Sequence, residues 1–338
     1  MPVPETEYPK SSIHNLRNFQ LLGSEFPATW LQTDLRPKLK QCDTRSSELG
    51  YNFYVAPKSS SEVIEAFAEL VRPEIEDERM DLPKAALTFA QIEYPRLDAT
   101  VYLRRIDELG ERAGQKVTET GDPAESVAAL NEVLFEEEMF RGNTADYYNP
   151  LNSFLNDVLD RRLGIPITLS LIYMEVGRRI GFPLFGVGMP GHFLLKHYDV
   201  AGRSTLIDVF ERGLIVTEDD CQKKLNAIWD GQLALQPQFL LPVTRRQMLT
   251  RMLNNLKTIY LSQRNFRKTL QIVDLILVSY PRSPEDVKQR AVLRYNLDDY
   301  RGALADFEEY VRMLPDASDA EEIKQTALSL RRSMAMMN

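Results

Sequence analysis

The feature that most constrains the fold of this chain is an internal repeat near its C-terminal end. Residues 253–286 and 287–320 match at an offset of 34 residues. The aligned pairs are Phe266 with Tyr300, Leu270 with Leu304, Ile276 with Tyr310, and Pro281 with Pro315. A repeat of this length, with a proline closing each copy, predicts one pair of helices per copy. Each copy leaves an apolar face uncovered, so both copies need neighbours that cover it.

The spacing is that of a tetratricopeptide repeat, a 34-residue helix-turn-helix. We therefore expect residues 241–338 to form an all-α repeat domain. A final amphipathic helix over residues 319–337 would cover one end of the stack, and the preceding domain would cover the other. Stacked repeats form a concave groove, which predicts that a protein or peptide partner binds there.

A change of period at residues 164–196 predicts a different kind of domain before the repeats. Apolar residues form two helical stripes, one at 165, 169, 172, 176 and 180 and one at 167, 171 and 174. A helix that is apolar on two faces is a buried, central one. Short β-rich runs follow at 192–198, 204–210 and 213–217. These patterns predict a core helix packed on a small antiparallel sheet.

Helical signals also precede this core, so residues 58–240 are expected to form an α+β domain with a helical subdomain. Asp122 and Asn149 stand directly before a proline, and Asp81 two residues before one, each at the start of an amphipathic segment, as helix N-caps do. Residues 1–57 have little apolar periodicity and many Pro, Ser, Asn and Gln residues. They predict a mostly irregular N-terminal extension.

The block from "YYNPLNSF" to "PGHFLLK", followed by "LIDVF" and the paired repeats, resembles the SirB-type family. Members of that family join a transglutaminase-like domain to tetratricopeptide repeats. The resemblance covers roughly residues 60–338 and implies a papain-like core. Enzymes with this core use a cysteine at the helix start, a histidine on the next strand and an aspartate on the strand after it. The helix N-terminus favours the thiolate, the histidine holds the proton, and the carboxylate orients the imidazole.

Carried over residue by residue, the resemblance matches His192 to the histidine and Asp208 to the aspartate, but it places Pro166 at the cysteine position. Ser170, one helical turn further on, is a candidate substitute nucleophile. The alternative is that the Ser170 hydroxyl bonds the helix backbone or lines a polar pocket. Cys221 follows "TEDD", whose three carboxylates would raise a thiol pKa, so it is expected to be structural.

Composition argues against several classes of protein. The formal net charge of −8 disfavours nucleic acid as a partner. No segment approaches about 18 consecutive apolar residues, so no membrane span is expected. Two cysteines, Cys42 and Cys221, fit a reducing cytoplasm better than a disulfide framework. Three scattered histidines and the absence of phosphate-loop, dinucleotide or paired-cysteine motifs predict no metal and no cofactor.

Two functions follow from these observations. The favoured one is a non-catalytic, degenerate transglutaminase-like protein that mediates protein–protein interaction through its repeats. The alternative is a peptidase, amidase or acyl transferase that uses His192 and Asp208 with a nucleophile other than cysteine. The sequence leaves the oligomeric state open.

Overall fold

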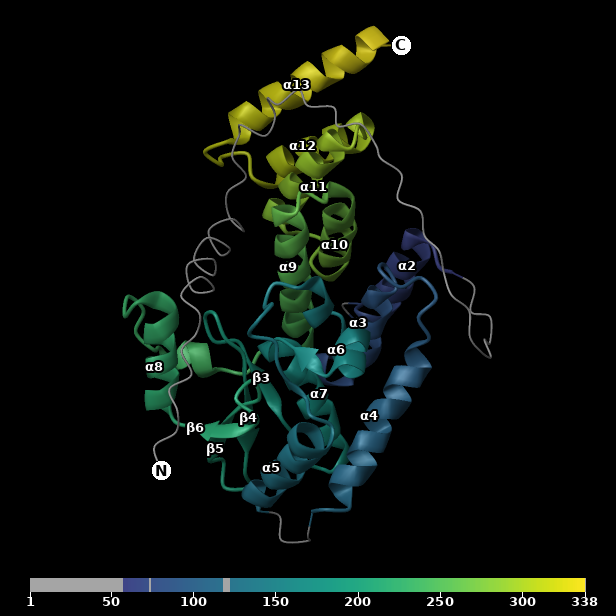
Figure 1. The fold of residues 1–338 in the computed structure, drawn as a ribbon. Helices are drawn as coiled ribbons and strands as arrows, with labels where there is room; N and C mark the ends of the chain where they lie inside the picture. Colours follow the sequence, from purple (N-terminus) through teal and green to yellow (C-terminus); the bar gives the residue numbers. More distant parts are fainter. Residues whose placement is uncertain (1–56, 73, 118–121, 338) are drawn as a thin grey trace.

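The computed structural model describes residues 57–72, 74–117 and 122–337 (Figure 1). The predicted N-terminal extension lies outside the described residues, apart from residue 57. The α-helices are α2 (Ser60–Leu70), α3 (Leu82–Ala90), α4 (Ala99–Gly114), α5 (Pro123–Asn131), α6 (Leu155–Arg161), α7 (Pro166–Arg179), α8 (Glu218–Trp229), α9 (Arg245–Ser262), α10 (Phe266–Ser279), α11 (Pro284–Asn296), α12 (Tyr300–Met313) and α13 (Ala320–Met337). The strands are β1 (Arg141–Gly142), β2 (Leu163–Gly164), β3 (Phe185–Val187), β4 (Leu194–Tyr198), β5 (Ser204–Asp208) and β6 (Leu214–Val216).

The predicted α+β core is confirmed as a four-stranded antiparallel sheet in the order β3-β4-β5-β6. Successive side chains on a strand point to opposite faces. Leu195 and Ile207 therefore belong to the large core that includes α7, whereas Leu194 and Leu206 pack with α8 on the other face. The sheet is thus enclosed between α7 and α8 (Figure 1). A short parallel pair, β1 with β2, adds a contact that the sequence did not predict.

Helix α7 is the buried central helix that the two apolar stripes predicted. Every residue from Pro166 to Gly177 is buried. Pro166 occupies its first turn, where its missing N–H costs nothing. The Thr168 hydroxyl accepts a hydrogen bond from the backbone N–H of Ile165 at 3.1 Å and donates one to the Asn152 carbonyl at 2.8 Å. These hydrogen bonds fix the start of α7, and neither involves a nucleophilic side chain at position 166.

The helical subdomain begins as its caps predicted. The side chains of Asp81, Asp122 and Asn149 each accept a backbone N–H from the turn that follows. The segment after Pro123 departs from the single helix that its pattern suggested, because it widens into a π-helix over Glu132–Glu137. Three consecutive apolar side chains of that turn are buried. The wider turn therefore keeps an apolar run in the core.

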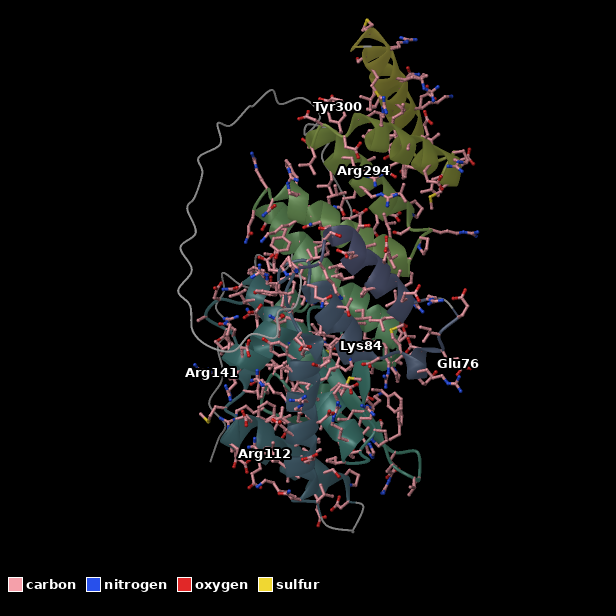
Figure 2. All side chains as sticks on the ribbon, turned by 90° about the vertical axis from the view of Figure 1, so that its right-hand side faces the viewer. Glu76, Lys84, Arg112, Arg141, Arg294 and Tyr300 are labelled. Atoms are coloured by element: carbon pink, nitrogen blue, oxygen red, sulfur yellow. The ribbon has the colours of Figure 1, made fainter. Side chains whose placement is uncertain are left out.

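The repeat region is the predicted all-α stack from α9 to α13, extending away from the sheet (Figure 1). Figure 2 shows the length of the molecule, with Arg294 and Tyr300 near the repeat end and Arg112 and Arg141 toward the opposite end. Helix α10 joins two cores: its Ile272 belongs to the same core as α3 and α7, and its Val273 to the core of the later repeats.

Polar contacts reinforce this junction. The Asp77 carboxylate accepts the backbone N–H groups of Arg245 at 2.7 Å and Arg246 at 3.1 Å, the first two residues of α9. Lys268 of α10 pairs with Glu93 at 2.7 Å. At the predicted boundary between residues 240 and 241 the secondary structure changes from the sheet and α8 to the repeat helices. The hydrophobic core nevertheless continues across this boundary.

Candidate functional site

The two residues matched to catalytic positions are His192 and Asp208. They lie side by side at one end of β4 and β5, the two central strands of the sheet. Strands β4 and β5 run antiparallel with Leu195 opposite Ile207, so the start of β4 is next to the end of β5. His192 Nε2 lies 2.9 Å from Asp208 Oδ2, and both side chains are buried. Gly191, just before the histidine, has a φ of +76°, a backbone conformation that glycine adopts readily.

The Asp208 carboxylate has further partners that a catalytic aspartate does not require. Lys224 of α8 donates from Nζ to Asp208 Oδ2 at 2.5 Å, and the same Nζ lies 3.5 Å from His192 Nε2. Asp208 Oδ1 accepts the backbone N–H groups of Phe210 at 3.1 Å and Glu211 at 3.3 Å. Burial acts to raise the pKa of Asp208, but His192 and Lys224 outweigh it and hold that pKa well below its ordinary value. The carboxylate is therefore ionised and shared between two nitrogen groups.

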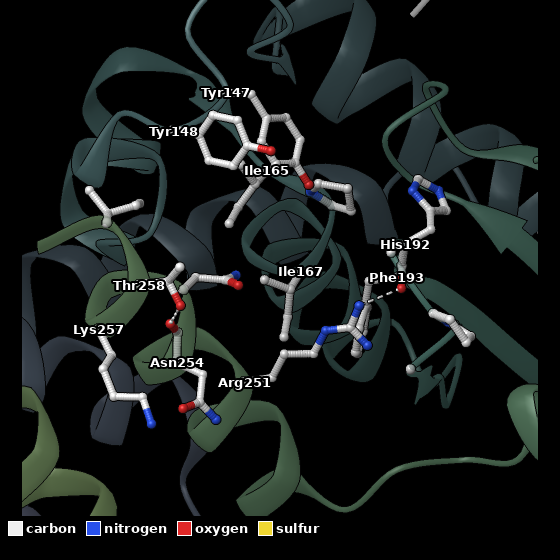
Figure 3. Close-up of a pocket in the computed structure, with 16 residues that line it drawn as sticks. Tyr147, Tyr148, Ile165, Ile167, His192, Phe193, Arg251, Asn254, Lys257 and Thr258 are labelled. Atoms are coloured by element: carbon white, nitrogen blue, oxygen red, sulfur yellow. Dashed lines mark hydrogen bonds between the residues drawn. The ribbon is translucent and has the colours of Figure 1, made fainter. Parts of the chain in front are cut away.

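A cavity of about 650 Å³ lies beside this pair and is lined by residues from both parts of the chain. The described residues that line it are Tyr147, Tyr148, Ile165, Pro166, Ile167, Gly188, Pro190, Gly191, His192, Phe193, Arg251, Asn254, Asn255, Lys257, Thr258 and Ile259. They come from the loop before α6, the start of α7, the loop between β3 and β4, and helix α9 (Figure 3). The cavity lies where the resemblance places the cleft of a transglutaminase-like domain, and α9, the first helix of the repeat region, forms one of its walls.

Pro166 stands in the cavity wall at the start of α7, where the resemblance places the nucleophilic cysteine. A proline side chain offers no nucleophile and its nitrogen no hydrogen-bond donor. The three matched positions are therefore brought together by the fold, but one of them carries no reactive atom.

Ser170 is not brought to this site, so its proposed role as a substitute nucleophile finds no geometric support. It is completely buried, it is not among the residues that line the cavity, and its Oγ has no hydrogen-bond partner among the described residues. The reason is the helical rise: four residues advance the chain by about 6 Å along the axis. A residue one turn beyond Pro166 therefore sits inside the core rather than at the cavity wall.

Cys221 is a buried residue of the small core between the sheet and α8. Burial, together with the nearby Asp208 and Asp220 carboxylates, raises the pKa of its thiol to about 11. The structural role predicted from the acidic neighbours agrees with this environment. Cys42, the other cysteine, lies outside the described residues.

We expect Cys221 to be unreactive toward thiol reagents in the folded chain, because only the thiolate attacks and very little forms well below its pKa. The measurement is Ellman's reagent titration at pH 8 on a Cys42→Ser variant, which leaves Cys221 as the sole thiol. Native protein should show less than about one tenth of the labelling rate seen in guanidinium. Rapid native labelling at a rate equal to that of the denatured chain would contradict the buried assignment.

The sequence reasoning missed Lys224 and the cavity-facing side of α9. Lys224 is separated from Asp208 by 16 residues, and no local pattern connects them. On α9 a signal was present: Arg251, Asn254, Asn255 and Thr258 recur at the spacing of one helix face. A second polar face on a repeat helix, beside the apolar face that packs in the core, indicates a lined cavity.

Among the described residues no group of three or more His, Cys, Asp or Glu side chains could hold a metal ion. None of the described helices has both the length and the apolar character that crossing a membrane requires.

Comparison with known proteins agrees with the two-part architecture. Residues 100–254 match the model of the transglutaminase-like superfamily, and residues 256–327 match a tetratricopeptide repeat model. A UPF0162 protein of Xylella fastidiosa (strain Temecula1) is 32% identical over 253 residues, which are 74% of this chain and 90% of that protein. A UPF0162 protein of Vibrio cholerae is 28% identical over 242 residues, covering 72% and 85% of the two chains.

A eukaryotic protein shares the region as well. The human F-box only protein 21 is 33% identical over 179 residues, which are 50% of this chain and 28% of that protein. Among solved structures, menin has a TM-score of 0.38 at 11% identity over 81% of this chain and 75% of menin, a similarity too weak to support an inference. The extent of the match to the Xylella protein and the order of the two domains lead to one conclusion: the chain belongs to the UPF0162 (SirB-type) family, in which a transglutaminase-like domain is followed by tetratricopeptide repeats.

Proposed function

We propose that this protein is a non-catalytic member of the transglutaminase-like superfamily that binds a peptide segment of a partner protein. The observation that carries the proposal is a cavity of about 650 Å³ that is lined by both the degenerate cleft and the first repeat helix. Tetratricopeptide repeats in general bind proteins. In this chain α9 contributes both the first repeat helix and one wall of the cleft, so a bound peptide would contact both parts.

The nucleophile position supports the absence of catalysis. Pro166 replaces the cysteine, and Ser170 and Cys221 both lie away from the cavity. Lys224 also occupies one side of Asp208, which makes the aspartate part of a buried ion pair. We also propose a cytoplasmic location, which rests on the sequence composition, and a regulatory role, which rests on the resemblance to the SirB-type family alone.

One observation favours the alternative of an amidase or acyl transferase: His192 lines the cavity and keeps its 2.9 Å contact with Asp208. Without a protein nucleophile at the site, such an enzyme would have to use a water molecule that His192 deprotonates. This requirement gives the test a clear target, since His192→Ala would abolish any turnover of that kind.

The catalytic test is a labelled-amine incorporation assay and a peptidase panel on the wild type, His192→Ala and Cys221→Ser. We expect no turnover above the buffer rate for any of the three. Turnover by the wild type that is lost in His192→Ala would establish the enzymatic alternative and overturn the proposal.

The binding test fills the cavity without touching the His192–Asp208 pair. Thr258→Trp places a large side chain on the cavity face of α9, whereas Thr326→Trp places the same group on α13, outside the cavity. Retention of a fluorescein-labelled random heptapeptide mixture on the immobilised full-length chain should fall at least tenfold in Thr258→Trp and stay unchanged in Thr326→Trp. Equal retention by both variants would remove the cavity from the proposed function.

A further inference from the structure

Arg251 is the one cation of the cavity wall that lacks a carboxylate partner among the described residues. Its Nη2 donates to the backbone carbonyls of His192 at 2.7 Å and Met189 at 3.1 Å, and its guanidinium lies over the ring of Phe193 at 5.4 Å. The other lining cation, Lys257, is paired with Asp286 at 2.8 Å. Arg251 thus contributes an uncompensated positive charge.

No aspartate or glutamate is among the described residues that line this cavity, although the whole chain has a net charge of −8. Burial lowers the pKa of Arg251, yet a guanidinium remains protonated at neutral pH. The Arg251 side chain is partly buried, and a partly desolvated charge without a counter-charge is costly. The wall is therefore electrostatically complementary to an anion that enters from outside.

The face of α9 around Arg251 supplies neutral polar groups for the same purpose. Asn254, Asn255 and Thr258 lie three, four and seven residues after Arg251, so the four residues share one side of the helix, and all of them line the cavity. Figure 3 shows Arg251, Asn254 and Thr258 on this helix. Amide and hydroxyl groups donate hydrogen bonds to carboxylate oxygens. The opposite wall is formed by Tyr148, Ile165 and other apolar or aromatic side chains, which suit the rest of a peptide.

We infer that this cavity binds a peptide through a carboxylate group, which pairs with Arg251 and accepts hydrogen bonds from the polar face of α9. The inference rests on the proposed peptide-binding function and names the group that is recognised. One uncompensated guanidinium matches a single negative charge, whereas a phosphate dianion would leave a second charge unpaired in the cavity. The carboxylate is either the C-terminus of the peptide or an acidic side chain.

The key variant is Asn255→Asp, which leaves the carbonyl contacts of Arg251 intact. An aspartate four residues after an arginine faces it on the helix and supplies an internal counter-charge. It should therefore occupy Arg251 and repel an incoming carboxylate. Asn226→Asp, on the exposed surface of α8, adds the same charge away from the cavity and serves as the matched control. Arg251→Gln removes the charge itself.

The experiment measures retention of four labelled random heptapeptide mixtures on the immobilised full-length chain. The first has a free C-terminal carboxylate and no Asp or Glu, the second is its C-terminal amide, the third is an amide with one Glu, and the fourth is an amide with one phosphoserine. We expect the wild type and Asn226→Asp to retain the first or third mixture at least tenfold more than the second. Asn255→Asp and Arg251→Gln should lose that preference.

The outcomes separate this inference from the function on which it rests. Equal retention of all four mixtures by the wild type would overturn the carboxylate site and leave peptide binding intact. Preference for the phosphoserine mixture, or an unchanged carboxylate preference in Asn255→Asp, would also overturn it. No retention of any mixture would overturn the proposed function and this inference together. Preference for the first mixture assigns the C-terminal carboxylate, and preference for the third assigns the side chain.

Discussion

Replacing Asp208 by asparagine is expected to lower the free energy of unfolding by about 3–5 kcal/mol, the usual cost of breaking a buried ion pair from one side. The change is nearly isosteric but removes the charge that holds Lys224 at 2.5 Å and His192 at 2.9 Å. Lys224 would be left largely buried, facing a neutral amide. Urea denaturation at pH 7 measures the loss.

The exposed neighbour Asp219 provides the control, because Asp219→Asn changes the same charge on the surface of α8. That variant should stay within about 0.5 kcal/mol of the wild type. Losses of equal size in Asp208→Asn and Asp219→Asn would show that the buried cluster contributes no special stability.

The Asp208 contribution also has a defined pH dependence. Its folded-state pKa lies below the unfolded value of about 3.9, so the folded chain binds fewer protons there. The stabilisation is therefore fully present well above about pH 4 and is lost as the pH falls through the folded pKa. The stability difference between wild type and Asp208→Asn should accordingly shrink below about pH 4. A difference that grows on acidification would contradict the sign of the shift.

Truncating Leu256 to alanine is expected to destabilise the whole chain by about 2–5 kcal/mol. Leu256 lies on α9, is completely buried, and belongs to the core that also contains residues of α3 and α7. Because that core crosses the predicted domain boundary, the repeats and the transglutaminase-like part should unfold in one transition. Tryptophan fluorescence and far-ultraviolet circular dichroism, followed together in urea, measure this.

Leu241→Ala is the matched control, since the side chain of Leu241 is 60% exposed just before α9. It should change the stability by less than about 0.5 kcal/mol. Two separate transitions in Leu256→Ala, with only the repeat helices destabilised, would instead favour repeats that fold independently over residues 241–338.

Much of the architecture was predictable because it depends on local patterns. The 34-residue offset predicted the repeat helices, and the two apolar stripes predicted that α7 would be buried. The motifs around His192 and Asp208 predicted two residues on neighbouring strands, and their side chains lie 2.9 Å apart, although β4 begins two residues after His192. Cap residues before prolines predicted where several helices start.

Other features depend on which elements meet, and no local pattern carries that information. The helical period of α7 allows Ser170 either to face the cleft or to lie in the core. Ser170 is completely buried, because α7 is packed deep inside the folded chain. Lys224 reaches Asp208 because α8 covers the outer face of the sheet.

By itself the sequence determined which faces are apolar, where the repeats lie, and that Pro166 stands where the resemblance places the nucleophile. The tertiary structure alone decided that a repeat helix lines the cavity, since Arg251 and the His192 carbonyl that it binds are 59 residues apart. The spacing of apolar residues along a segment indicates which of its side chains face the core and which face solvent. The meeting of distant segments depends instead on the shape and free energy of the assembled core, which joins α9 and α10 to the transglutaminase-like domain.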